Sequence, residues 1–297
     1  MASPLRTAPR SSRTRTARPA DVAICPDPVF VIGAPRSGTT VVARALAEHE
    51  DFWSGDESQV LVDLFGDGEL GRNYERVSRP DGSWLQKQGI AREEFLACVG
   101  LGLNALFTSA SRGKRWVDHT PSHALLAETL AEMFPGAFFL HVLRDGRRVV
   151  HSMIHFLQQS RWAHAEGGVL EPWMSDFRSA CRVWRRYVEA GIAFADTAPD
   201  RCLAVVSEEL LRDPDEIFTT ILAFLQADHD PRPAEYFSTH RINSSFMADS
   251  TSRASVEELL GPNPWESWSA EQRKIFLEEA AEALVACGLA TEQELSA

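Results

Sequence analysis

Residues 30–40 place an apolar run, two glycines, an arginine and a threonine pair in an order that suits anion binding. The apolar residues predict a strand and residues 40–49 a helix, so a tight turn joins them. Backbone N–H groups in such a turn converge at the positive end of the helix dipole and can bind phosphate or sulfate. Gly33 and Gly38 allow close approach to the anion, and Arg36 adds a forked cation.

The two glycines of this turn have the spacing of a Walker loop, but Thr39 stands where the Walker lysine is expected. Thr40 keeps the place of the Walker hydroxyl residue. The turn therefore predicts a phosphate-bearing ligand and disfavours an ATPase or kinase that binds Mg²⁺. An ordinary strand-to-helix turn is the alternative interpretation, since short glycine motifs are common.

A second candidate segment follows the apolar run at residues 138–143. Arg144 ends this predicted strand, and Ser152 lies two turns into the helix expected at residues 146–159. The carboxyl ends of parallel strands meet at one edge of a sheet, so both side chains can face the ligand of the first turn.

The run Pro35-Arg36-Ser37-Gly38-Thr39-Thr40 resembles the 5′-phosphosulfate loop of sulfotransferases that use 3′-phosphoadenosine-5′-phosphosulfate (PAPS). Arg144 and Ser152 are similar to the family's second element, a strand-ending arginine with a serine eight residues later, which holds the 3′-phosphate. The resemblance covers most of residues 28–230 and implies sulfuryl transfer without a metal. The implied 5′-phosphosulfate residues are Arg36, Ser37, Gly38, Thr39 and Thr40.

Sulfuryl transfer needs a base for the acceptor proton and positive charge for the leaving phosphate, a role that Arg36 can also fill. Glu57 is the candidate base, because Gly55-Asp56-Glu57-Ser58 resembles the Gly-Glu-Glu-Thr stretch of tyrosylprotein sulfotransferases, whose second acid is the base. The alternative for Glu57 is a first-turn acid favoured by the helix dipole.

His119 is the second catalytic candidate. The segment Asp118-His119-Thr120-Pro121 resembles the family's Lys-Thr-Pro element, whose lysine assists the leaving group, with histidine in place of lysine. His119 could assist the leaving group, shuttle a proton or act as the base, and a polar histidine in a turn is the alternative.

Three further segments carry weaker signals. Asn243-Ser244-Ser245 resembles a late family segment that folds over the cofactor, and Arg253 is expected to reach the 3′-phosphate. His151 and His155 are expected to be pocket walls or structural residues. Residues 207–214 resemble the family's Glu-x-Leu-x-x-Asp-Pro stretch before a helix.

The chain has 297 residues and a formal net charge of −12, which argues against broad nucleic-acid binding. Its five cysteines are scattered, and no apolar run approaches the ~20 residues of a membrane span, so we expect a cytoplasmic protein without disulfides. Residues 1–24 form an arginine-rich arm that we expect to be disordered, and residues 25–297 form the folded domain.

Strands are predicted at residues 29–33, 138–143 and 202–206, with a short one at 116–117, and helical patterns alternate with them. This order predicts an α/β fold: a P-loop-type parallel sheet with helices on both faces in a single domain. Residues 51–58 are expected to be a loop, residues 66–89 an irregular surface excursion, and residues 122–134 a helix.

The leading hypothesis is a PAPS-dependent sulfotransferase that modifies a hydroxyl, or an amine, of a small-molecule or natural-product acceptor and leaves adenosine 3′,5′-bisphosphate (PAP). The rivals are a P-loop kinase and a non-catalytic nucleotide-binding protein. No membrane or nucleic-acid partner is expected, and homo-oligomer formation stays open.

Overall fold

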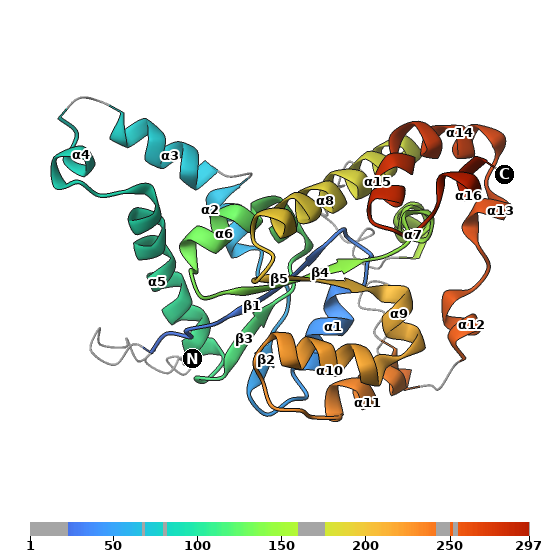
Figure 1. Ribbon diagram of the computed structural model, residues 1–297, viewed down its shortest axis with the longest axis horizontal. Helices are drawn as coiled ribbons and strands as arrows, with labels where there is room; N and C mark the ends of the chain where they lie inside the picture. The colour runs from blue at the N-terminus through green and yellow to red at the C-terminus, as the bar shows by residue number, and fades with distance from the viewer. Residues whose placement is uncertain are drawn as a thin grey trace, which may run out of the picture.

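A five-stranded parallel sheet runs through the centre of the part of the chain that the computed structural model describes, namely residues 23–66, 69–79, 82–159, 176–241, 250–251 and 255–296 (Figure 1). The strand order is β2-β3-β1-β4-β5, so the first strand lies in the middle. The strands are β1 Val29–Gly33, β2 Phe52–Ser54, β3 Arg115–Asp118, β4 Phe138–Leu143 and β5 Cys202–Val206.

The central strand β1 is buried along its whole length, as expected for a parallel strand covered on both faces. Val29 pairs with Val117 of β3 on one side and with Phe138 of β4 on the other. Side chains alternate between the two faces, so Val29 and Val31 join one apolar core while Phe30 and Ile32 join another.

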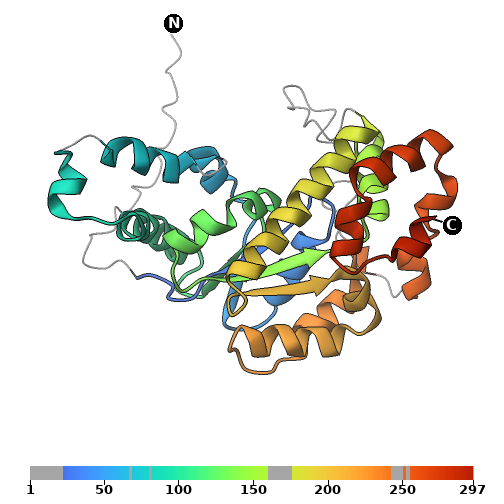
Figure 2. The ribbon, with the colours of Figure 1, turned by 45° about the horizontal axis from the view of Figure 1, so that its top comes forward.

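Helices cover both faces of the sheet, and Figure 2 shows α8 on one side and α10 on the other. The core containing Val29 packs against α1, α10 and α11, and the core containing Phe30 packs against η2, α6 and α8. These helices are α1 Thr39–Leu46, η2 Pro121–Leu126, α6 Ala127–Met133, α8 Phe177–Thr197, α10 Pro214–Phe224 and α11 Arg232–Thr239. The predicted α/β fold with a doubly covered parallel sheet is confirmed.

The remaining described elements lie around this centre. A third apolar core joins α7 and α8 to the helices at the C-terminal end. The other helices are α2 Val60–Phe65, α3 Glu69–Ser78, α4 Trp84–Gln88, α5 Arg92–Ala110, α7 Gly146–Gln159, α9 Ser207–Arg212, α12 Val256–Leu260, α13 Pro264–Ser267, α14 Ala270–Glu279, α15 Ala281–Ala286 and α16 Glu292–Ser296. Strands β6 His240–Arg241 and β7 Ser250–Thr251 pair antiparallel.

The prediction of an irregular excursion at residues 66–89 is wrong, because α3 and α4 occupy most of it. Helix α3 is anchored to α5 by Tyr74, whose ring centroid lies 5.4 Å from that of Phe95 and whose hydroxyl donates to the Ile90 carbonyl at 2.7 Å. The polar composition of this stretch hid its helical spacing. Figure 1 shows α3 and α4 beyond α5, to one side of the sheet.

Two other predictions need correction. The loop expected at residues 51–58 contains the edge strand β2, which pairs with β3 from Phe52 opposite Arg115. A strand of three residues is too short for its alternation to be recognised. The helix expected at residues 122–134 is a 3₁₀ turn, η2, followed by α6.

The predicted N-terminal arm lies almost entirely outside the described residues, so the domain boundary at residue 25 stays a prediction. In the described part of the chain, no helix combines the length and the apolar character needed to span a membrane.

Candidate active site

The turn between β1 and α1 has a backbone that glycine makes possible. A Cβ atom on Gly33 would lie 2.6 Å from the Val142 carbonyl oxygen, so only glycine allows this approach to β4. Gly38 has φ 104°, in the region that other residues rarely adopt, and it directly precedes α1. Ser37 and Thr39 are buried and Thr40 is half-buried, so the turn is a packed structure with a fixed shape.

The two segments that the sequence predicted to share a ligand touch each other. Arg144 donates through Nη1 to the Arg36 carbonyl oxygen at 2.9 Å, and Arg36 donates through Nε to Ser152 Oγ at 3.3 Å. The Arg36 guanidinium carbon also lies 5.3 Å from the ring centroid of Phe156, one turn beyond Ser152 in α7. Residues from the ends of β1 and β4 thus form one cluster of cations and hydroxyls.

Burial and neighbouring cations act on both arginines, Arg144 on Arg36 and Arg148 on Arg144. Burial and, to a lesser extent, the charge of Arg144 lower the pKa of Arg36 to about 10, against the opposing effect of Glu57. Burial also lowers the pKa of Arg144, against the opposing effect of the Glu208 carboxylate. Because guanidinium groups stay charged in proteins, an anion bound between the two side chains would relieve an unfavourable pair of like charges.

A cavity of about 580 Å³ adjoins this cluster. Arg144, Ser152, His151 and His155 line one side of it, so the expectation that the two histidines are pocket walls fits the structure. Segment 260–267 lines the other side, and sequence reasoning gave no sign of this contribution. A separate cavity of about 610 Å³, between Trp265, Trp268 and Leu295 among others, contains none of the predicted site residues.

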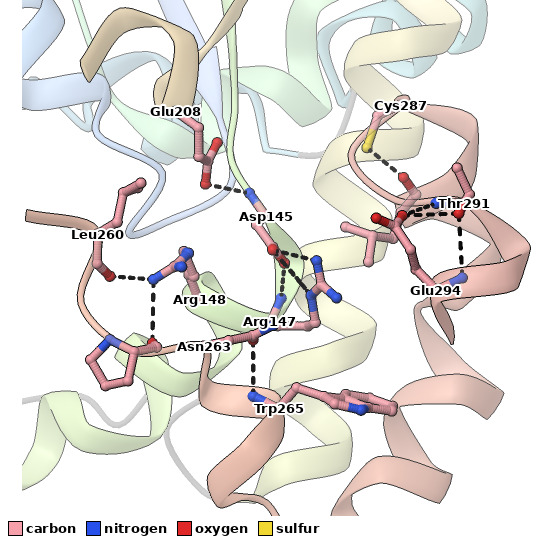
Figure 3. Close-up of polar contacts among 12 residues, drawn as sticks. Asp145, Arg147, Arg148, Glu208, Leu260, Asn263, Trp265, Cys287, Thr291 and Glu294 are labelled. Carbon is pink, nitrogen blue, oxygen red and sulfur yellow. Dashed lines mark hydrogen bonds and ion pairs between the residues drawn. The ribbon is translucent and has the colours of Figure 1, made fainter. Parts of the chain in front are cut away.

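Arg148 fastens the C-terminal wall of the 580 Å³ cavity to α7. Its guanidinium donates to the carbonyl oxygen of Leu260, and the Gly261 and Pro262 carbonyls lie 3.4 Å away. Figure 3 shows Arg148 reaching across from α7 to this segment.

Glu208 acts on Arg144 through its charge and was missed as a site residue, although the Glu-x-Leu-x-x-Asp-Pro resemblance pointed to its segment. Its Oε1 accepts from the Asp145 backbone N–H at 3.1 Å (Figure 3). Its Oε2 is buried without a hydrogen-bond partner in the described part of the chain. The carboxylate therefore supplies negative charge next to the buried guanidinium of Arg144.

Glu57 lies close enough to Arg36 for the two charges to influence each other. The side chain is exposed at the surface, yet the protein atoms around its carboxyl group partly desolvate it. This desolvation raises the pKa of Glu57, Asp118 and Asp56 raise it further, and Arg36 and a hydrogen bond from Gln59 lower it. A carboxylate with a raised pKa is a stronger base than an ordinary one.

His119 is buried, with 2% of its surface exposed, and its Nδ1 lies 3.3 Å from Ser54 Oγ. Burial lowers its pKa, an effect that Asp118 opposes. The ring is therefore neutral at pH 7 and offers no positive charge to a leaving phosphate, in contrast to the lysine of the family element. The lowered pKa also makes the His119 ring a weaker base than an ordinary histidine.

Arg253 and the Asn243-Ser244-Ser245 segment lie outside the described residues. Among the side chains that are described, no group of three or more His, Cys, Asp or Glu residues has the arrangement of a metal site.

The sequence model of the sulfotransferase family matches residues 28–231. This chain belongs to the sulfotransferase family. The protein-tyrosine sulfotransferase of Drosophila melanogaster is 30% identical over 199 residues, which cover 66% of this chain and 37% of that protein. Protein-tyrosine sulfotransferase 1 of Danio rerio is 30% identical over 198 residues, which cover 66% of this chain and 52% of that protein. The chain thus spans about half or less of the length of those relatives.

Solved structures share the fold of this chain. The sulfotransferase domain of the Synechococcus PCC 7002 olefin synthase superposes with a TM-score of 0.51 at 18% identity, covering 89% of this chain and 98% of that one. A mouse sulfotransferase solved in complex with PAP gives 0.50 at 14% identity, covering 91% of this chain and 87% of that one. Both confirm the predicted fold class.

Proposed function

We propose that this sulfotransferase transfers the sulfuryl group of PAPS to a hydroxyl group of a small-molecule acceptor and releases PAP. The observation that carries the proposal is the contact of Arg36 with Arg144 and Ser152, at 2.9 and 3.3 Å. Two arginines that follow adjacent parallel strands, with a hydroxyl from the helix after the second strand, fit a ligand that carries two separate phosphate groups.

Each part of the site has one role in the proposed reaction. The backbone of residues 36–39 and the Arg36 guanidinium hold the 5′-phosphosulfate, and Arg144 and Ser152 hold the 3′-phosphate. Glu57 accepts the hydroxyl proton of the acceptor while the acceptor oxygen bonds to sulfur. The bond between sulfur and the bridging oxygen breaks, and Arg36 stabilises the charge that develops on the leaving phosphate.

The charges around Glu57 bear on the kind of acceptor. Protein tyrosine is the acceptor that the names of the relatives state, and it is the main competitor for the proposal of a small molecule. The acidic side chains Asp56 and Asp118 both raise the pKa of Glu57, and the chain has a net charge of −12. A neutral or cationic acceptor is therefore favoured over an acidic peptide. The scattered cysteines support the further proposal of a cytoplasmic location.

Ligand-dependent stability tests the choice of nucleotide. We expect PAP to raise the melting temperature, since a ligand present at 100 times its Kd stabilises the native state by about 2.7 kcal/mol. ATP with Mg²⁺ is expected to have little effect, because the buried Thr39 replaces the Walker lysine. Stabilisation by ATP with Mg²⁺ and none by PAP would favour the kinase alternative and overturn the proposal.

Transfer of ³⁵S from labelled PAPS tests the reaction and the acceptor. A panel of neutral phenols and alcohols, amines and an acidic tyrosine peptide is incubated with the enzyme in the presence of EDTA. The proposal predicts labelling of a neutral hydroxyl compound. Labelling of the peptide alone would refute the small-molecule acceptor, and PAP binding without labelling of any acceptor would favour the non-catalytic alternative.

A further inference from the structure

The segment that carries Glu57 has no regular secondary structure of its own, because β2 ends at Ser54 and α2 begins at Val60. Side chains from the turn after β3 hold it instead. Ser58, the residue next to Glu57, donates through Oγ to Asp118 Oδ2 at 2.5 Å and through its backbone N–H to Thr120 Oγ1 at 3.1 Å. Two hydrogen bonds thus fix the chain immediately beside the proposed base.

Asp118 and Thr120 are themselves rigidly placed. The Oδ1 atom of Asp118 accepts from the Thr120 backbone N–H at 3.0 Å and from Thr120 Oγ1 at 2.8 Å. Asp118 is 5% exposed and Thr120 is fully buried, so water competes little with these bonds. Asp118 ends β3, which pairs with both β1 and β2, so the sheet itself sets the position of this pair.

We propose that Ser58, Asp118 and Thr120 form a clamp that positions Glu57 opposite the phosphosulfate loop; the inference rests on the function proposed above. The three are positioning residues, since they act through the backbone of the Glu57 segment. In this chain the element that resembles Lys-Thr-Pro would thus position the proposed base through Asp118 and Thr120, the residues on either side of His119.

The clamp also affects the charge state of the base. Partial desolvation of the carboxyl group by the surrounding protein atoms is the largest cause of the raised pKa of Glu57, and the Asp118 carboxylate is the next. The other charges that act on Glu57 are Arg36, which lowers its pKa, and Asp56, which raises it. The His123 ring lies 3.6 Å from Asp118 Oδ1, but burial lowers the pKa of that histidine and opposes its protonation beside the carboxylate.

Paired substitutions separate positioning from folding. Ser58→Ala removes the hydrogen bond to Asp118, and Thr120→Val removes the two hydrogen bonds that Thr120 Oγ1 makes with Ser58 and Asp118. For each variant we expect kcat to fall about tenfold or more while the Kd for PAP changes less than about twofold. Ser58→Thr and Thr120→Ser keep the hydroxyl and should retain most of the activity. Ser111→Ala is the control, because Ser111 is as buried as Thr120 and donates to the Thr108 and Lys114 carbonyls before the opposite end of β3. It should lower thermal stability without changing kcat.

Asp118→Asn tests the charge of the clamp. Removing a negative charge beside Glu57 lowers its pKa, so the acidic limb of the kcat/KM profile should move to lower pH, while Ser58→Ala leaves that limb in place. A ¹³C-carboxyl NMR titration, with Glu57→Gln used for assignment, measures the same shift without any activity.

The possible results distinguish the clamp from the proposed function. If the wild type is active but Ser58→Ala and Thr120→Val keep full turnover, the clamp alone is overturned. The same conclusion follows if these variants lose kcat and PAP affinity together. A wild type that transfers no sulfuryl group would overturn the proposed function. In that case the ¹³C-carboxyl NMR titration of Glu57, which needs no activity, would still test the clamp. An unmoved Glu57 midpoint in Asp118→Asn would then contradict it.

Discussion

At the scale of single residues, Arg36 connects the two nucleotide-binding segments. Its backbone has φ 74°, which is uncommon for a residue other than glycine, and this conformation turns its carbonyl toward the guanidinium of Arg144. Its side chain donates a hydrogen bond to Ser152, and the charge of Glu57 raises its pKa. Arg36 thus lies between the proposed 3′-phosphate site and the proposed base, where the leaving phosphate must be held.

Arg144→Ala is expected to weaken PAP binding by about 10- to 100-fold, because it removes charge-assisted hydrogen bonds to phosphate. Calorimetric titration with PAP measures the effect. Arg212→Ala removes the same charge from an exposed position in α9 and should leave the Kd unchanged. Equal losses in the two variants would mean that Arg144 acts only through overall charge.

The sequence predicted the meeting of Arg36, Arg144 and Ser152, since residues that follow parallel strands gather at one edge of the sheet. It did not predict Glu208, Arg148 or the clamp at Ser58. Arg148 and the clamp act through contacts between segments 60 or more residues apart, such as Ser58 with Asp118 and Arg148 with Leu260. Tertiary packing decides such contacts, and no local pattern records them.

At the scale of elements, the turn before α1 depends on the left-handed backbone of Gly38. Gly38→Ala is expected to destabilise the protein by about 1–2 kcal/mol, because a side chain strains this conformation, and to weaken PAP binding as the turn shifts. Urea denaturation without ligand and PAP titration measure the two effects.

Gly102→Ala provides the matched control. Gly102 lies on the exposed side of α5, with open space where a Cβ would be placed. Alanine in a helix is about 0.5–1 kcal/mol more favourable than glycine, so this variant should gain stability and bind PAP normally. If both glycine variants behaved alike, the special role of the Gly38 backbone would be refuted.

The elements differ in how well sequence pattern predicted them. Strands β1, β4 and β5 have the predicted bounds, because each is a continuous apolar run of five or six residues, and β1 and β4 are almost entirely buried. The edge strand β2 is too short to show a pattern, and the mainly polar α3 depends on the contact of Tyr74 with Phe95.

At the scale of the whole molecule, α14 is fastened to α8 by ion pairs around Glu279. Its carboxylate accepts from Arg178 at 2.5 Å and from Arg182 at 2.9 and 3.0 Å. Hydrogen bonds from Arg182, then from Arg178, lower the pKa of Glu279 to about 2. This network joins the C-terminal helices, and with them the wall of the 580 Å³ cavity, to the rest of the fold.

A depressed pKa makes the contribution of Glu279 pH-dependent. It is fully present above the ordinary glutamate pKa near 4.5 and is lost as the pH falls through about 2. Glu279→Gln should therefore cost about 1 kcal/mol at pH 7, since solvent screens the partly exposed arginines, and the cost should shrink as the pH falls from 4.5 toward 2.

Denaturant unfolding at several pH values measures this difference. Glu189→Gln, which removes an exposed partner of Arg185 on α8, is the control and should cost less than about 0.5 kcal/mol at any pH. A Glu279 effect that stayed constant down to pH 2 would show that the side chain contributes through packing alone.

The most direct test of the account compares the rate of ³⁵S transfer from PAPS by the wild type and by Glu57→Gln at pH 7, with PAP affinity measured alongside. The account predicts a rate lower by about 10²- to 10⁴-fold with a nearly unchanged Kd for PAP, because the amide cannot accept the proton of the acceptor. Full turnover by Glu57→Gln would contradict it and remove Glu57 as the base.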